Sequence, residues 1–272
     1  MLPITVPFQT PKRISNNLSH VRKRQNKYRK NIALFFLYIR LSSDFLLHRP
    51  FNNEINMEPT CFILLRHGET VANKAGILQG WYESPLDDNG VKQVECAAEY
   101  LKDRHIDAIY CSDLQRAIQT AEIAGKYHPD APIHHVHDLR EWNCGIFEGH
   151  HQTEIKKTNP EVINTFADEY VVPNMPGGET REVFQKRIED FFTATACENP
   201  GKTFLVITHG GTMGRIFRMA AGLVSPNNRI PMPTNASVSS ILYLPDKNGW
   251  WLTEWNINHY LSHLNIVKTL VL

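Results

Sequence analysis

Cysteine is scarce in this sequence and follows no metal-binding or disulfide pattern. The 272 residues hold five cysteines, an odd number without CxxC spacing, at positions 61, 96, 111, 144 and 197. Cys61, Cys111 and Cys197 lie in apolar settings, where free thiols pack as small hydrophobic groups. The pattern argues against a disulfide scaffold and a zinc site, and it is typical of a reducing compartment. We therefore expect a cytoplasmic protein.

Long apolar runs, internal repeats and low-complexity tracts are lacking as well. The apolar run Ile32 to Ile39 is much shorter than the ~20 residues that a membrane-spanning helix needs. Arg40 and Asp44 interrupt its continuation. The sequence therefore predicts no membrane span.

Acidic residues are nearly absent from the first 57 positions. This segment holds ten Lys and Arg against Asp44 and Glu54, whereas residues 58–272 hold 19 basic and 26 acidic residues. We interpret residues 1–57 as a poorly ordered extension, with Met57 as the working start, and residues 58–272 as the folded domain. The basic cluster from Arg22 to Lys30 leaves two alternatives, an organelle-targeting peptide or an arm that binds nucleic acid or membrane. We expect no nucleic-acid partner.

From Thr60 onward, apolar strands alternate with helical patterns. Val91, Val94, Ala97, Ala98 and Leu101 recur at three- and four-residue intervals, as on one face of a helix. The remaining helices are predicted at Leu114–Tyr127 (capped by Ser112-Asp113), Glu154–Glu169 (interrupted by Pro160), from Glu179 (inner face Val183, Phe184, Ile188, Phe191 and Phe192) and Thr212–Leu223. Strands are predicted at 61–65, 106–111, 133–137, 204–207, 237–244 and 250–260, the last two forming a hairpin. The alternation indicates an α/β fold, a three-layer α/β/α sandwich around a largely parallel sheet.

Two of these strands end in the same way. Arg66-His67-Gly68 follows the first strand, and Thr208-His209-Gly210-Gly211 ends a strand much later in the chain. Ligands of open α/β sheets bind at the carboxyl ends of the strands. We therefore predict that both imidazoles lie at one edge of the sheet, although either histidine alone could equally be a core residue.

The residues around these histidines suit phosphate chemistry. A neutral His67 could attack phosphorus through one ring nitrogen while a hydrogen bond holds the other. Arg66 offers a planar, charged fork for phosphate oxygens, and Gly68 would let the backbone approach an anion without a Cβ. Arg116 lies in the first turn of a predicted helix, where anions bind. Taken alone, Arg116 could also be an ordinary solvated helix residue.

Two acidic residues and a histidine cluster are further candidates. Glu141, flanked by Trp142 and apolar residues, is a candidate proton donor if burial raises its pKa; Glu148 is its rival, and a surface ion pair is the alternative for both. In the run from His134 to His137, a strand would place His135 and His137 on one face. A third ligand with suitable spacing is missing, so we predict no metal site.

Taken together, these motifs resemble the histidine phosphatase superfamily, which has the phosphoglycerate-mutase-like fold. The motifs match it in order and spacing over residues 60 to about 260. They are Arg66-His67-Gly68-Glu69-Thr70 with Asn73, Gln79-Gly80, Ser112-Asp113-Leu114 with Arg116, Leu139-Arg140-Glu141, Pro176-Gly177-Gly178-Glu179 and Thr208-His209-Gly210-Gly211. Nothing in residues 1–57 belongs to the pattern.

The resemblance implies a mechanism. His67 would be the nucleophile that forms a phosphohistidine, and Arg66, Arg116 and His209 would hold the phosphoryl oxygens. Glu141 would protonate the leaving oxygen and then activate water, without a metal or other cofactor. Asn73, Gln79, Gly80 and Gly210, with Gly68, would line the phosphate pocket.

The resemblance also bears on the reaction type. Classical mutases of the family carry a longer, arginine-rich insertion between the acid and the Gly-Gly-Glu motif. Here the segment from Glu141 to Gly177 is short and has Lys156-Lys157 as its only basic residues. We therefore expect a phosphatase acting on a small phosphorylated metabolite. A phosphoglycerate-mutase-type phosphoryl transferase and a non-catalytic relative that binds phosphorylated ligands or proteins are the alternatives. The oligomeric state stays open, and a homodimer is one option.

Overall fold

One mixed sheet organises the part of the chain that the computed structural model describes, which is residues 58–162, 175–223, 230–247 and 249–264. Its strands are β1 (Thr60–Arg66), β2 (Ala108–Ser112), β3 (Ile133–Val136), β4 (Thr203–Thr208), β5 (Val238–Leu244) and β6 (Gly249–Ile257). They lie in the order β3-β2-β4-β1-β5-β6. Neighbours pair in parallel except at β1/β5 and β5/β6, so β5 alone among these strands runs opposite to the others. The prediction of a largely parallel sheet is confirmed.

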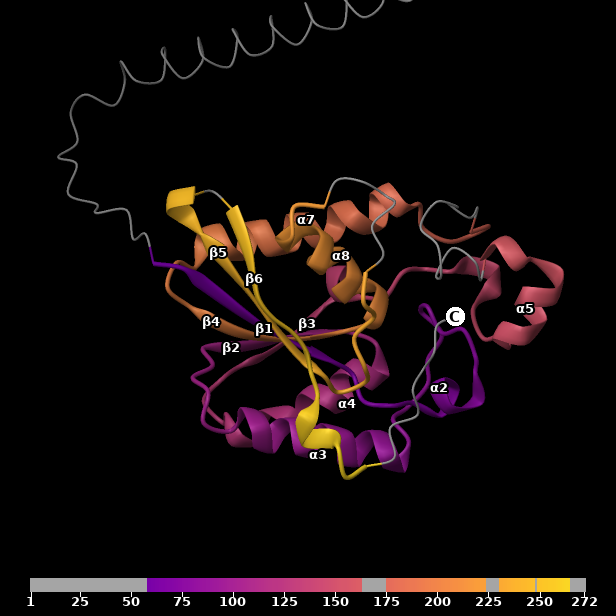
Figure 1. Ribbon diagram of the computed structural model, residues 1–272, viewed down its shortest axis with the longest axis horizontal. Helices are drawn as coiled ribbons and strands as arrows, with labels where there is room; N and C mark the ends of the chain where they lie inside the picture. Colours follow the sequence, from indigo (N-terminus) through magenta and orange to yellow (C-terminus); the bar gives the residue numbers. More distant parts are fainter. Residues whose placement is uncertain (1–57, 163–174, 224–229, 248, 265–272) are drawn as a thin grey trace, which may run out of the picture. The chain divides into compact units, whose positions relative to one another are not determined.

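Helices cover both faces of the sheet. Helices α3 (Asp88–Leu101) and α4 (Gln115–Ala124) lie on one side, and α7 (Arg181–Glu198) and α8 (Gly210–Ala220) lie on the other (Figure 1). The shorter elements are α2 (Val71–Ala75), α5 (Gln152–Thr158) and single 3₁₀ turns at Gly125–Tyr127, His137–Leu139, Gly145–Phe147, Pro245–Lys247 and His259–Leu261. This is the three-layer sandwich that the sequence predicts.

The alternation of side chains along β1 builds the two halves of the core. Phe62 and Leu64 point into the cluster formed with α7 and α8, whereas Ile63 and Leu65 join the cluster formed with α3 and α4. Because successive strand residues face opposite sides, an unbroken apolar run is what a strand covered on both faces requires. Fully burying one such side chain contributes about 1.5–3 kcal/mol.

Several predicted boundaries differ from the structure. The predicted cap Ser112-Asp113 is wrong: Leu114 occupies the N-cap position of α4 and makes no side-chain cap bond. Val183 is 55% exposed and not on the inner face of α7, because the buried stripe runs through Phe184, Ile188 and Phe192 at four-residue spacing. The helix expected from Thr212 begins two residues earlier, at Gly210.

Other predictions need a smaller correction or fall outside the described residues. Cys197 is exposed rather than packed, and all five cysteines are free thiols. The extension 1–57, the second half of the helix predicted at 154–169 and the tail 266–272 lie outside the described residues. Within the described ranges, no helix combines the length and the apolar character that crossing a bilayer requires.

Candidate active site

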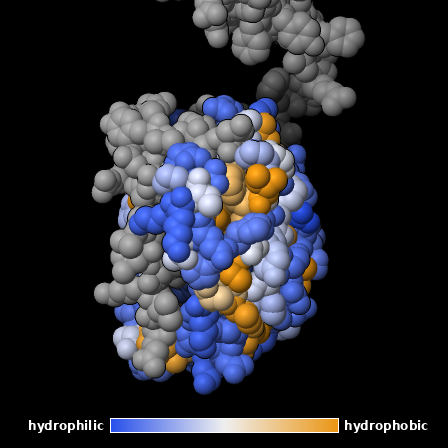
Figure 2. Space-filling model, turned by 90° about the vertical axis from the view of Figure 1, so that its right-hand side faces the viewer, coloured by the Kyte–Doolittle hydropathy of each residue, from blue (hydrophilic) through white to orange (hydrophobic). Residues whose placement is uncertain are grey.

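The two strand-end histidines meet at one edge of the sheet. The parallel pairing of β1 with β4 places Arg66 opposite Thr208, so His67 and His209 follow at the same level. Their ring centroids are 5.1 Å apart, and both side chains are almost completely buried. The sheet edge that carries them faces the viewer in Figure 2, where hydrophilic residues predominate and apolar ones form separate groups.

The hydrogen bonds of His67 determine its tautomer. Its Nδ1 lies 2.7 Å from the carbonyl oxygen of Gly68, which can only accept. The neutral ring therefore carries its proton on Nδ1, and the lone pair lies on Nε2. That nitrogen is thus available as a nucleophile, with the ring orientation held by Gly68.

His209 adopts the opposite tautomer. Its Nδ1 accepts a hydrogen bond from Nε of Arg116 at 3.1 Å, because a guanidinium can only donate. The proton therefore lies on Nε2, which donates to Oγ of Ser112 at 2.8 Å. Both ring nitrogens thus have protein partners, so contact of His209 with a phosphoryl oxygen requires one of these bonds to be exchanged.

Arg116 is fully buried and only partly paired. Besides His209, its guanidinium donates to the carbonyl oxygens of Gly80 at 2.7 Å and Tyr82 at 3.1 Å. Three of its five N–H groups have described acceptors. The remaining two are free to meet an anion.

Arg66 carries an unpaired donor. One terminal nitrogen of its guanidinium donates to the carbonyl of Pro233 at 2.6 Å. Its buried Nε–H has no acceptor among the described residues. A buried donor without a partner costs about 1–3 kcal/mol, so this N–H is available to a ligand that supplies an acceptor.

The charges of the site call for an anion. Burial lowers the pKa of both Arg66 and Arg116 to about 10, and the neighbouring Glu141 opposes this shift in each case. Glu141 acts on both guanidiniums, and Glu83 and Glu148 also act on Arg116. Because buried charge is costly unless it is paired, these two guanidiniums suit the binding of a phosphate group.

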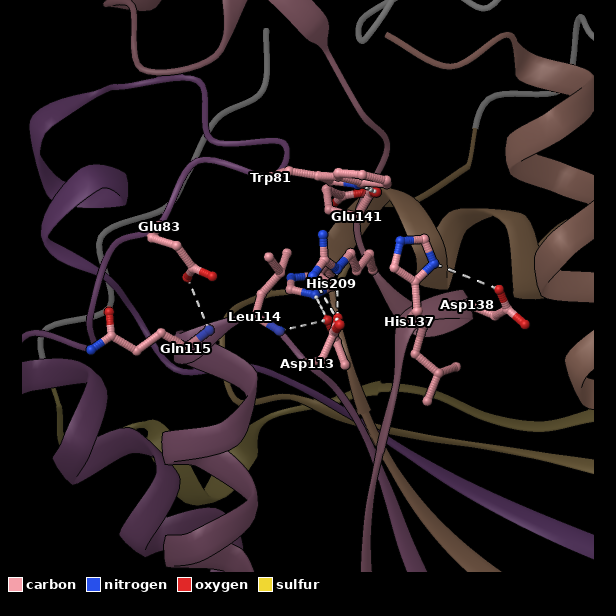
Figure 3. Close-up of polar contacts among 12 residues, drawn as sticks. Trp81, Glu83, Asp113, Leu114, Gln115, His137, Asp138, Glu141 and His209 are labelled. Carbon is pink, nitrogen blue, oxygen red and sulfur yellow. Dashed lines mark hydrogen bonds and ion pairs between the residues drawn. The ribbon is translucent and has the colours of Figure 1, made fainter.

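Two backbone N–H groups hold the carboxylate of Glu141, a residue that Figure 3 draws directly below Trp81. One carboxylate oxygen accepts from the backbone N–H of Trp142 at 2.9 Å, and the other accepts from that of Gly211 at 2.8 Å. A Cβ on Gly211 would overlap the carboxylate of Glu141, so the second glycine of the His-Gly-Gly motif leaves room for this acid.

Comparison with known proteins agrees with this geometry. The model of the histidine phosphatase superfamily (branch 1) matches residues 62–258.

The chain belongs to this superfamily.

Its relatives include phosphatases and a mutase. A metal-independent phosphoserine phosphatase of Arabidopsis thaliana is 31% identical over 217 residues, which are 79% of this chain and 89% of the relative. The uncharacterized phosphatase PhoE of Bacillus subtilis (strain 168) is 32% identical over 203 residues, 75% of this chain and 97% of the relative. The solved structure of a phosphoglycerate mutase from Bacillus anthracis superposes with a TM-score of 0.65 at 27% identity, covering 77% of this chain and 98% of that one.

In this member of the histidine phosphatase superfamily, Glu148 braces a loop. Its Oε1 accepts from the backbone N–H groups of Trp81 and Cys144, both at 2.8 Å. Burial raises the pKa of Glu148, and these two hydrogen bonds oppose the shift. A Cβ on Gly80, whose φ is +53°, would overlap the same carboxylate. Gly80 therefore lets Glu148 reach the loop whose carbonyls bind Arg116.

The glycines beside the histidines have different tasks. The Cβ position of Gly68 faces Gly90 and Val94 of α3, with Gly90 O only 2.5 Å away. The missing side chain of Gly68 thus allows close packing on α3, a reason that the sequence does not reveal, and its role in binding phosphate stays a prediction. At Gly210 a Cβ would lie 3.3 Å from the guanidinium carbon of Arg66. Gly210 thus keeps space open beside Arg66.

Asn73 and Gln79 meet at Thr70, in the loop after β1. The Oδ1 of Asn73 closes the capping box of α2 with Thr70, and Oε1 of Gln79 accepts from the Thr70 hydroxyl at 3.0 Å. Their role in binding phosphate stays a prediction. Asn235 joins this loop to the end of β1, because its Nδ2 donates to the carbonyl oxygens of His67 and Gly68 at 3.1 and 3.2 Å.

Sequence reasoning missed Ser112 and Asn235 as parts of the site. Ser112 lies within a predicted strand–helix junction, where the sequence predicts a helix cap. Asn235 precedes β5, which starts where β1 ends because the two strands are antiparallel. The order of strands is the only signal that could have placed it there.

The histidine run at 134–137 does not form a site. Strand β3 ends at Val136, so His137 belongs to the following 3₁₀ turn and does not share a strand face with His135. His134 and His135 are exposed, and His137 packs edge-on against Trp81. In the part of the chain that the structure describes, no three His, Cys, Asp or Glu side chains gather as metal ligands would.

Acid should destabilise this fold through His67 and His209, which are the buried histidines of the part that the structure describes. Burial, followed by the charge of Arg116, holds the pKa of both His67 and His209 well below the ordinary value. Below about pH 6.5 these histidines bind protons in the unfolded chain but not in the folded one. The free energy of unfolding therefore has its full value above that pH and falls as the pH drops. The slope is about 1.4 kcal/mol per pH unit for each histidine.

Urea unfolding between pH 7.5 and 4.5 measures this slope. In His67→Gln, the free energy of unfolding should fall less steeply with acid, by the share of one histidine. His135→Gln, which removes an exposed histidine, should keep the wild-type slope. Equal slopes in His67→Gln and the wild type would contradict the assignment.

Proposed function

We propose that this chain is a metal-independent phosphatase that hydrolyses the phosphate monoester of a small metabolite through a phosphohistidine on His67. The observation that carries the proposal is the hydrogen bond between Nδ1 of His67 and the carbonyl oxygen of Gly68, which leaves Nε2 without a proton in a buried imidazole that feels the charges of Arg66 and Arg116. The family membership and the phosphatase relatives support it. We further propose residues 58–272 as the catalytic domain.

In the first step, Nε2 of His67 attacks phosphorus and the bond to the leaving oxygen breaks. The spare N–H groups of Arg66 and Arg116 stabilise the charge on the equatorial oxygens, which substitutes electrostatically for a metal ion. Glu141 gives its proton to the leaving oxygen, so an alcohol departs. The ring becomes a phosphorylated imidazolium whose Nδ1–H stays bound to Gly68.

In the second step, water replaces the alcohol. Glu141, now a carboxylate, takes a proton from water as its oxygen attacks phosphorus, and the P–N bond breaks. Inorganic phosphate leaves, and His67 returns to the neutral tautomer. Glu141 thus acts as acid and then as base, and its two backbone hydrogen bonds keep it in place for both steps.

Hydrolysis fits the site better than mutase chemistry. A mutase must hold a substrate that carries further negative charge. Lys156 and Lys157, the basic residues between Glu141 and Gly177, are exposed in the last turn of α5. Arg140, which lies near the site, is already paired with Asp113 through two hydrogen bonds at 2.5 and 2.8 Å.

The test is hydrolysis of 4-nitrophenyl phosphate in the presence of EDTA, followed by trapping of the intermediate. We expect turnover that EDTA leaves unchanged, and a rapidly quenched enzyme that carries one acid-labile, alkali-stable phosphoryl group on His67. Turnover abolished by EDTA would contradict the proposal. Interconversion of phosphoglycerates that depends on a bisphosphate primer would identify a mutase instead, and ligand binding without any turnover would identify a non-catalytic relative.

A further inference from the structure

Arg187, in the middle of α7, has all five of its N–H groups occupied. Its Nε and one Nη2 proton donate to the two carboxylate oxygens of Glu179, at 2.8 and 2.9 Å. The other three go to backbone carbonyls of a single segment: Asp138 at 2.6 Å, Arg140 at 2.8 Å and Glu141 at 2.8 Å. A guanidinium has five donors in a rigid fork, so this side chain has one orientation.

The base of this fork is itself fixed. Phe184 and Ile188, on either side of Arg187 in α7, are buried in the core, and the guanidinium lies 4.8 Å from the centroid of the Phe184 ring. The side chains of Arg187 and Glu179 are only 10% and 12% exposed. Glu179 also accepts from the backbone N–H of Asn143 at 3.0 Å. The pair therefore fastens the segment from residue 138 to residue 143 to α7.

Glu141 lies within this segment. Its carbonyl oxygen accepts from Arg187 on one side and from Nε1 of Trp81, at 2.7 Å, on the other. One oxygen of its carboxylate accepts from the backbone N–H of Gly211, at the N-terminus of α8. The backbone of Glu141 is thus held from α7, and its side chain is held at α8.

We propose that Arg187 is a positioning residue that sets the backbone of Glu141 at the distance from which the carboxyl group can pass its proton. The inference rests on the proposed role of Glu141 as acid and base. Arg187 does not touch the reacting atoms, so removing it should displace the acid without removing it. A displacement of about 1 Å in a catalytic group can cost 10²-fold in rate.

The structure also predicts that charge alone cannot replace Arg187. Lysine keeps the positive charge but offers three donors from a single nitrogen, which cannot span Glu179 and three carbonyls together. Arg187→Lys should therefore resemble Arg187→Met. Lys186→Met is a matched control, because Lys186 is the adjacent residue of α7, is exposed and pairs with Asp190.

The experiment compares two aryl phosphates that differ in their need for an acid. Phenyl phosphate releases a weakly acidic phenol that requires protonation, whereas 2,4-dinitrophenyl phosphate releases a stable phenolate. For Arg187→Met and Arg187→Lys, kcat/KM with phenyl phosphate should fall roughly 10- to 100-fold. With 2,4-dinitrophenyl phosphate, kcat/KM should change by less than about threefold, since that step needs no acid.

The second step gives an independent readout. Hydrolysis of the phosphohistidine needs Glu141 as base whatever the leaving group was. With 2,4-dinitrophenyl phosphate, the Arg187 variants should therefore show kcat and KM lowered together, a burst of phenolate and accumulated phosphoenzyme. The burst amplitude also counts the correctly folded sites. If Arg187→Met does not fold, Arg187→Lys and Glu179→Gln answer the same question.

Glu141→Gln tests the role of Glu141 as acid separately from the role of Arg187 as positioning residue. It should show the same dependence on the leaving group with a larger loss. If Glu141→Gln lowers kcat/KM equally for both substrates, or not at all, Glu141 is not the acid. The proposed role of Arg187, which depends on that of Glu141, is then also wrong. A second outcome concerns Arg187 alone. If kcat/KM of Glu141→Gln depends on the leaving group, but kcat/KM of the Arg187 variants falls equally for both substrates or stays unchanged, only the role of Arg187 is wrong. Full activity in Arg187→Lys would also contradict the proposal, because it would show that the positive charge is sufficient and the five donors of the guanidinium are not needed.

Discussion

Replacing His67 by asparagine should reduce the hydrolysis of a phosphate monoester on the order of 10⁴-fold or more while the protein stays folded. The variant has no nucleophilic nitrogen at this position. An asparagine amide can still donate to Gly68 O, as Nδ1 of His67 does, so the local backbone keeps its hydrogen bond. The arginines are untouched, and binding of inorganic phosphate should therefore be retained.

Steady-state rates and phosphate binding are measured together to test this expectation. His135→Asn, at an exposed position on β3, is the control and should keep wild-type rates. A rate for His67→Asn within tenfold of the wild type would exclude His67 as the nucleophile. A variant that loses phosphate binding as well would show that the histidine had a structural role in assembling the site.

Arg116→Lys should damage both activity and stability. Each positioned donor that meets a developing negative charge is worth about 10²–10³ in kcat, so we expect kcat/KM to fall by about 10³-fold. The variant also leaves His209 Nδ1 and the carbonyls of Gly80 and Tyr82 without their fork. Because a buried group without a partner costs about 1–3 kcal/mol, the free energy of unfolding should fall by about 2–5 kcal/mol.

A matched substitution separates these effects from the general cost of exchanging arginine for lysine. Arg104 is half exposed and lies 3.9 Å from its partner Glu254, so Arg104→Lys should change neither property appreciably. Urea unfolding and kcat/KM are measured for both variants. Unchanged stability in Arg116→Lys would mean that the three contacts contribute little, and kcat/KM within tenfold of the wild type would remove Arg116 from the phosphate site.

Sequence reasoning could predict those residues of the site that lie within a recognisable local pattern. An apolar run that ends in Arg-His-Gly marks a strand tip, and two such tips on parallel strands have to share an edge. Arg116 was found because the first turn of a helix after a strand is a recognisable place. Glu141 and its rival Glu148 were candidates because of their apolar neighbours, and the family resemblance then favoured Glu141 and added Asn73, Gln79, Gly80 and Gly210.

The parts that were missed depend on pairings that no local pattern reveals. Ser112 was read as a helix cap because hydroxyls often cap helices, but its Oγ meets His209, which is 97 residues away in sequence. In the sequence, nothing distinguishes Arg187 from a solvated helix arginine. Only the fold brings the three backbone carbonyls within hydrogen-bond distance of its guanidinium. Asn235 comes within reach of His67 only because β5 runs against β1.

The central position of β1 in the sheet has a consequence for how the chain folds. This strand is among the first parts of the domain to be synthesised, yet its neighbours are β4, which pairs Thr203 with Cys61, and β5, which pairs Tyr243 with Thr60. Until those partners exist, both edges of a strongly apolar strand are unpaired, and such edges invite association with other chains. Because long-range pairings form slowly, the middle of the sheet closes late in folding. His67 therefore reaches His209 only after β4 has been synthesised and has paired with β1, so activity depends on this long-range pairing.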